Sequence, residues 1–195
     1  MISGLTEDCT VEVPVPGMQL AVRKAAMRDI APILELINGY AAKGIMLPRT
    51  EFEMSENIRD FSVVTLDERV LGCGALHFYS PTIGEIRSLA VREDAKTHGV
   101  GRRVVEALVQ EASGYSLDAV FAFTYVVDFF RKVGFREVER GELPLKAWKD
   151  CLRCPKFQCC DEVAVLRVLR PDHYQIWGER PATVDPELVM PVPAA

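Results

Sequence analysis

The most regular feature of the chain is an apolar pattern in its middle third. The apolar residues that recur there at every fourth position are Val100, Val104, Leu108 and Ala112. This spacing predicts one buried face of an α-helix. The short apolar run over residues 86–91 precedes it and predicts a mostly buried strand. Gly99 and Gly101 lie in the turn between the two, Lys-Thr-His-Gly-Val-Gly over residues 96–101, and so stand at the start of the predicted helix.

That turn has the chemistry of an anion site. Glycine has no Cβ, so a ligand can approach the main chain closely, and the first N–H groups of a helix are unpaired. Lys96, Arg102 and Arg103 bracket the turn with positive charge. The glycine spacing matches neither the phosphate loop that ends in Gly-Lys-Ser/Thr nor the three-glycine dinucleotide pattern. The turn therefore favours a pyrophosphate site of another kind over the alternative of an ordinary connection.

Helical and strand patterns alternate along the rest of the chain. Before the central strand, the pattern predicts a strand over residues 18–24, a helix over 30–41, a second helix that Thr50 and Glu53 cap, and a hairpin of strands over 62–66 and 70–79. After the central helix, it predicts strands over residues 119–124, from 135 and over 161–170, a short helix over 129–133, and a helical turn over 143–151. This order predicts an α/β fold with a central mixed β-sheet flanked by helices.

Composition and charge narrow the class of protein. The chain has 195 residues, of which 49% are hydrophobic and 26% charged, enough for one sizeable core. We expect a flexible arm over residues 1–17, one domain over 18–170 and a loosely ordered tail over 171–195. A net charge of −5 argues against nucleic-acid and anionic-membrane binding. The chain start lacks a secretory pattern and no apolar run is long enough for a membrane helix, so we expect a cytoplasmic protein.

Two separate motifs resemble the GNAT superfamily of acetyl-CoA-dependent N-acetyltransferases. The first is the strand Ser-Leu-Ala-Val over residues 88–91 with the turn over 96–101, in which Lys96 stands where the family usually has Gln or Arg. The second is Val-Phe-Ala-Phe-Thr over residues 120–124 with Phe-Phe-Arg-Lys-Val-Gly-Phe over 129–135. The resemblance covers residues 18–140 and implies the GNAT fold, an enzyme and acetyl-CoA as co-substrate. The residues that it implies for acetyl-CoA binding are Leu89, Ala90, Val91, Lys96, Thr97, His98, Gly99, Val100, Gly101, Arg102 and Phe130.

Finer details resemble the short-form bacterial N-acetylglutamate synthases, which lack a kinase domain. They are Gly-Glu-Ile-Arg-Ser-Leu-Ala-Val over residues 84–91, the threonine-ended strand, the Phe-Phe-x-x-x-Gly-Phe helix and Leu-Pro-Arg over 47–49. The resemblance implies acetyl transfer to the α-amine of L-glutamate in arginine biosynthesis. Two alternatives stay open: acetylation of another small amine or a protein N-terminus, and an acetyl-CoA sensor without catalysis.

Acetyl transfer needs a base, because the amine attacks only when it is neutral. The resemblance places a glutamate base at the spacing of Glu85, which could equally be a solvated carboxylate at a strand end. Main-chain N–H groups around residues 89–91 could stabilise the oxyanion. Phe130 stands where many family members have a tyrosine acid, so the thiolate must take its proton from another group, from water, or after leaving. Tyr125 is a candidate substitute, or an inert aromatic.

A glutamate substrate carries two carboxylates, which guanidinium groups can hold bidentately. Arg49 and Arg87 are the candidates, and Arg87 shares a strand face with Glu85; the alternative for both is a surface salt bridge. Thr124 could bind substrate or simply end its strand, and His77 could assist proton removal or be structural. Such a small-molecule site leaves the oligomeric state open, with a homodimer among the options.

The cysteines of the last third form a cluster. Its members are Cys151, Cys154, Cys159 and Cys160. The first two have the Cys-x-x-Cys spacing of a zinc site, whereas two adjacent cysteines rarely bind one tetrahedral ion. A structural zinc, a redox or disulfide clip, and free buried thiols therefore all remain open.

Overall fold

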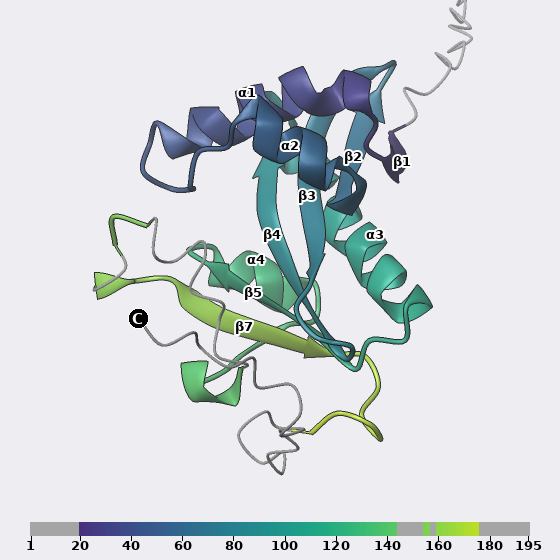
Figure 1. Cartoon of the computed structure of the whole chain (residues 1–195), viewed down its shortest axis with the longest axis vertical. Helices are drawn as coiled ribbons and strands as arrows, with labels where there is room; N and C mark the ends of the chain where they lie inside the picture. The colour runs from purple at the N-terminus through teal and green to yellow at the C-terminus, as the bar shows by residue number, and fades with distance from the viewer. Residues whose placement is uncertain (1–19, 144–153, 157–158, 176–195) are drawn as a thin grey trace, which may run out of the picture.

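The structure of the protein is a computed structural model that describes residues 20–143, 154–156 and 159–175 (Figure 1). In these residues a seven-stranded sheet has the order β1-β2-β3-β4-β5-β7-β6. Its strands are β1 (Ala21–Lys24), β2 (Phe61–Leu66), β3 (Arg69–Phe78), β4 (Ile83–Val91), β5 (Ala119–Thr124), β6 (Arg136–Glu137) and β7 (Val163–Val168). Only the pairing of β4 with β5 is parallel in this described sheet. The predicted mixed α/β sheet is therefore confirmed.

Helices cover both faces of the sheet. The α-helices are α1 (Ile30–Ala41), α2 (Glu51–Asn57), α3 (Val100–Gly114) and α4 (Val127–Lys132), and the short 3-10 helices are η1 (Met27–Asp29), η2 (Ile58–Asp60), η3 (Glu93–His98) and η4 (Arg140–Glu142). One buried cluster joins α1 and α2 to their face of the sheet, and another joins α3 and α4 to the opposite face (Figure 1). The residues of the predicted α3 face, Val100, Val104, Leu108 and Ala112, are all fully buried.

The predicted local signals hold where the structure describes them. Thr50 and Glu53 form the reciprocal cap of α2, and the hairpin turn at Asp67 and Glu68 has φ values of 45° and 71°. The last strand, β7, is shorter than predicted, and β1 begins at Ala21 within the described residues. The predicted arm lies outside the described residues, as do nearly all of the helical turn over 143–151 and most of the tail, so the domain boundaries stay predictions.

A bulge in β4 and the divergence of β4 from β5 create the opening in the sheet. Ser88 has a φ of 54°, and the β3–β4 register jumps there, so that Gly74 faces two residues of β4. The parallel pairing of β4 with β5 runs from Ile83↔Ala119 only to Glu85↔Phe121. Beyond Glu85 the two strands separate. Figure 1 shows β2, β3 and β4 diverging there from β5 and β7.

Candidate functional site

The start of α3 has the open donors that a diphosphate needs. Gly99 is the N-cap residue with φ 72° and ψ 10°, and no side chain in the described residues caps the helix. The carbonyl of Gly99 accepts the first helical hydrogen bond, from the N–H of Arg103 at 3.1 Å. The N–H groups of the first turn therefore point out of the helix end with its positive dipole. This arrangement fits the diphosphate of coenzyme A.

The structure separates the roles of the two glycines. A Cβ at Gly99 would meet no heavy atom within 4 Å, so the glycine is needed for its left-handed backbone and leaves space open above the turn. A Cβ at Gly101 would lie 3.4 Å from the ring of Phe129 on α4 and 3.5 Å from Val91. Gly101 therefore packs between α4 and the end of β4.

Lys96 is directed towards α1. Its ammonium lies 2.9 Å from the Glu93 carboxylate and 5.3 Å from the ring centre of Tyr40, and the Glu93 bond raises the pKa of Lys96. The Tyr40 hydroxyl donates to the carbonyl of Val91 at 2.6 Å. These contacts fasten the turn after β4 to α1. A direct contact of Lys96 with acetyl-CoA stays a prediction.

The other side chains predicted for the cofactor turn lie on its surface. Thr97 and His98 are exposed, and the Thr97 Oγ1 lies 3.4 Å from the His98 Nδ1. Arg102 forms an exposed ion pair with Glu106 at 2.9 Å. Phe130, by contrast, is buried in the α3 cluster, with its ring edge-to-face to those of Phe129 and Phe135. The cofactor contacts of these side chains stay predictions.

The predicted base and the two arginines predicted to bind the amino-acid substrate lie on the face of the sheet that α1 and α2 cover. Glu85 is 5% exposed, and Arg87 follows two residues later, before the bulge, so both point to the face that α1 and α2 cover. Arg49 and Arg87 line one cavity of about 10 Å³, together with Glu53, Met54, Asn57 and Phe61. The two arginines predicted to hold carboxylates thus come from segments far apart in sequence and line the same cavity beside α2.

Asn38 of α1 fixes the main chain of Arg49. The Asn38 amide nitrogen donates to the carbonyl of Arg49 at 3.0 Å, and its amide oxygen accepts from the N–H of Arg49 at 2.9 Å. This double contact orients the loop that carries Arg49 over the face of the sheet. The sequence contains no signal for it, because the two residues lie on different elements.

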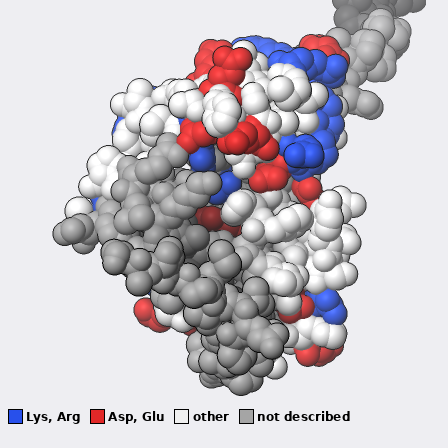
Figure 2. Space-filling view, in the orientation of Figure 1, with Lys and Arg blue, Asp and Glu red and all other residues white. Residues whose placement is uncertain are grey.

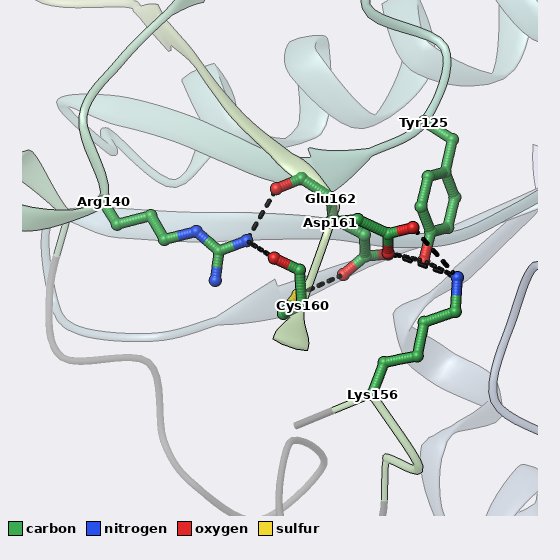
Figure 3. A network of polar contacts seen from close by, with 6 residues as sticks. All are labelled: Tyr125, Arg140, Lys156, Cys160, Asp161 and Glu162. Atoms are coloured by element: carbon green, nitrogen blue, oxygen red, sulfur yellow. Dashed lines mark hydrogen bonds and ion pairs between the residues drawn. The ribbon is translucent and has the colours of Figure 1, made fainter. Parts of the chain in front are cut away.

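The end of β5 is held by side-chain contacts. Thr124 is buried, and its hydroxyl accepts from the N–H of Val126 at 3.0 Å, as in a strand-end turn. Tyr125 donates to Asp161 at 2.8 Å and accepts from Lys156 at 3.1 Å (Figure 3). Burial raises the pKa of the Tyr125 phenol. Substrate binding by Thr124 and an acid role for Tyr125 both stay predictions.

The described part of the cysteine cluster holds no metal-binding group. Cys154, Cys159 and Cys160 are free thiols, and no set of three or more His, Cys, Asp or Glu side chains that could hold a metal occurs in the described ranges. Arg140 donates to the carbonyls of Cys160 and Glu162 and so holds this segment beside β7 (Figure 3). Cys151 lies outside the described residues, and the predicted zinc stays a prediction.

The surface charge is mixed around the helices. Figure 2 shows acidic and basic side chains interspersed over α1 and α2. None of the helices in the described residues is long and apolar enough to cross a membrane.

Comparison with known proteins identifies the family of this chain. The model of the Acetyltransferase (GNAT) family matches residues 33–135. The chain belongs to the GNAT acetyltransferase family. An uncharacterized N-acetyltransferase of Chlorobaculum tepidum is 39% identical over 80% of this chain and 100% of that protein. An amino-acid acetyltransferase of Mycobacterium tuberculosis is 37% identical over 68% of this chain and 77% of that protein.

Solved structures agree with this assignment. The M. tuberculosis protein Rv2747, solved in complex with CoA and NLQ, has a TM-score of 0.67 and 29% identity over 76% of this chain and 99% of its own. The N-acetylglutamate synthase of Neisseria gonorrhoeae, complexed with coenzyme A and N-acetyl-glutamate, has a TM-score of 0.70 and 28% identity over 78% of this chain but 35% of its own. The GNAT protein described here is thus an acetyl-CoA-dependent N-acetyltransferase that resembles amino-acid acetyltransferases.

Proposed function

We propose that this GNAT protein transfers the acetyl group of acetyl-CoA to the α-amine of L-glutamate, as an N-acetylglutamate synthase of arginine biosynthesis. The observation that carries the proposal is the shared cavity of Arg49 and Arg87, on the same sheet face as the buried carboxylate of Glu85. Two guanidinium groups suit the two carboxylates of glutamate. The amino-acid acetyltransferases among the relatives support the same substrate class.

Glu85 is the proposed base. The substrate amine arrives as an ammonium group and attacks only after it has lost a proton. Glu85 is a buried residue, 5% exposed, so few water molecules compete for that proton. Glu85 is the last residue of β4 that pairs with β5, so it lies where these two strands begin to separate. The amine would therefore lie between Glu85 and the thioester.

The main chain of β4 and α3 is proposed to hold acetyl-CoA. Beyond the bulge at Ser88, β4 has no parallel pairing with β5, so its main-chain groups there face the opening. An N–H group around residues 89–91 would stabilise the oxyanion of the acetyl carbonyl. The open N–H groups at the start of α3 would bind the diphosphate.

The leaving thiolate is proposed to take its proton from water, and the nitrogen of the tetrahedral intermediate to lose its second proton to water. Phe130 has no hydroxyl group, and the Tyr125 hydroxyl already donates to Asp161. Nothing in these contacts directs a side-chain proton to the sulfur. The reaction would then depend on the base and on positioning, with protonation of the thiolate after the C–S bond breaks.

A thiol-release assay tests the proposed substrate. The protein is mixed with acetyl-CoA and each member of a panel of free amino acids, small amines and N-terminal peptides. Release with glutamate well above every other acceptor supports the proposal. Release with a different amine alone would show that glutamate is not the substrate. Tight acetyl-CoA binding without any release would indicate a sensor and overturn the proposed acetyl transfer.

The variant Glu85→Gln tests the proposed base. It keeps the size of the side chain but cannot accept the proton, so kcat should fall about 10²-fold or more, while the Kd for acetyl-CoA stays unchanged. Glu56→Gln is the matched control, because Glu56 is an exposed residue of α2. A normal kcat in Glu85→Gln, or an unaltered pH–rate profile, would remove Glu85 from the mechanism.

A further inference from the structure

Glu85 must release a proton after every turnover. A base that is 5% exposed has little direct contact with bulk water. The cavity that Arg49 and Arg87 line on the same face of the sheet measures about 10 Å³, which is about the space of one water molecule. A route for the proton from Glu85 to solvent is therefore part of the chemistry that the site requires.

His77 is the cross-strand neighbour of Glu85. The two residues are directly opposite in the β3–β4 register, and the pairs on either side, Leu76↔Ile86 and Phe78↔Gly84, continue that register without interruption. Residues directly opposite in an antiparallel pair have Cβ atoms about 4.5–5.5 Å apart. Ala75, two residues before His77, packs in the cluster of α1 and α2, so His77 points to the same face as Glu85.

Asp60 of η2 lies near the imidazole of His77. Its Oδ2 lies 3.6 Å from Nδ1 of His77, and the two side chains are 33% and 39% exposed. His77 therefore has the buried Glu85 as its cross-strand neighbour on β4 and the partly exposed carboxylate of Asp60 on η2 within ion-pair distance. Arg87, two residues after Glu85 on β4, is the next charged residue on the same face. A ring with two nitrogens can accept a proton on one and release one from the other.

We propose that His77 carries the proton from Glu85 to solvent, with Asp60 orienting its ring. The substrate N–H bond breaks and the proton passes to the Glu85 carboxylate. The Glu85 O–H bond then breaks, and the proton moves to Nε2 of His77. The N–H bond at Nδ1 then breaks, and this proton passes to water near the Asp60 carboxylate. The loss of this proton returns the imidazole to its neutral form. His77 is a positioning and relay residue that acts through Glu85, so the inference rests on the proposed acetyltransfer and on the base role of Glu85.

Rescue by small buffers distinguishes a relay from a structural role. His77→Gln and Asp60→Asn are compared with wild type in the thiol-release assay, with the best acceptor of the panel, at low and at high imidazole concentration. His173→Gln is the control, because His173 is exposed in a turn after β7. Thermal unfolding and the Kd for acetyl-CoA report whether each variant is folded.

His77→Gln should lower kcat about 10²-fold in dilute buffer, and imidazole should restore a large part of the loss, with the Kd for acetyl-CoA unchanged. Asp60→Asn should lower kcat less, and imidazole should restore that loss too. His173→Gln should behave as wild type. A normal kcat in His77→Gln, or a loss that imidazole does not restore in either variant, overturns the relay alone. Absence of thiol release by wild type with every acceptor overturns the proposed function and the relay together.

Discussion

Replacing Gly99 by alanine tests whether the start of α3 binds the diphosphate of acetyl-CoA. Gly99 has φ 72° and ψ 10°, and a Cβ there would meet no heavy atom within 4 Å. The protein itself has room for the methyl group, so the cost is that of the left-handed backbone, about 1–2 kcal/mol. The chain can avoid this strain by rotating the peptide groups around residue 99.

That rotation would turn the N–H groups of the first α3 turn away from the ligand. A hydrogen bond to a charged group contributes about 1.5–3 kcal/mol, so the loss of one such bond to the diphosphate weakens binding about 10-fold to 100-fold. Gly99→Ala should therefore raise the Kd for acetyl-CoA by at least about 10-fold, as measured by titration calorimetry. Urea unfolding measures the loss of stability separately.

Gly101→Ala is the matched control for Gly99→Ala. A Cβ at Gly101 lies 3.4 Å from Phe129, which is an ordinary contact, and faces the protein. Alanine is favoured over glycine in a helix by about 1 kcal/mol, so stability should be unchanged or slightly higher. Alanine at position 101 also keeps the main-chain N–H that is proposed to bind the diphosphate, so the Kd for acetyl-CoA should stay near that of wild type. If both variants bind acetyl-CoA as tightly as wild type, or both weaken it equally, the reasoning about Gly99 is refuted.

Three further predictions concern packing, pH and the acceptor loop. Gly74→Ala would place a Cβ 2.8 Å from Val104 and 3.1 Å from Leu108, so unfolding free energy should fall by about 1–3 kcal/mol; an unchanged urea midpoint would show that α3 can shift there. Arg23 holds the pKa of the Asp29 carboxyl below its ordinary value, so this contribution to stability is present above the unfolded-state pKa and is lost as pH falls through the folded-state pKa. Asp29→Asn should remove that acid dependence, and an identical stability–pH curve would contradict it. Asn38→Ala removes both contacts to the Arg49 main chain, so the KM for the amino acid should rise about 10-fold with the KM for acetyl-CoA constant; the reverse pattern would place Asn38 elsewhere in the mechanism.

Local physics explains why the central part of the fold could be predicted from sequence. The α3 face repeats every fourth residue, and all four of its apolar positions are fully buried. The Thr50 cap depends on a residue three positions away, and both halves of it form. The glycine turn marks a helix start whose donors are uncapped. In each case the residues that decide the structure are close in sequence.

Contacts between distant segments account for what the sequence did not predict. The bulge at Ser88 has a positive φ without a glycine, and it follows from the register between β3 and β4, which no local pattern reveals. The contact of Lys96 with the ring of Tyr40 on α1 had no signal in the sequence either, because the two residues lie on distant segments. The contacts of Asn38 with Arg49 and of Asp60 with His77 also form only once α1 and η2 are placed against their neighbours.

A crystal structure of the protein with coenzyme A and N-acetylglutamate is the most direct test of the central claim. We predict the diphosphate within hydrogen-bond distance of the main-chain N–H groups at the start of α3, and the acetamide nitrogen beside the carboxylate of Glu85. The carboxylates of the product should face Arg49 and Arg87. A nucleotide bound away from the turn at Gly99, or an acetamide on the other face of β4, would contradict the account.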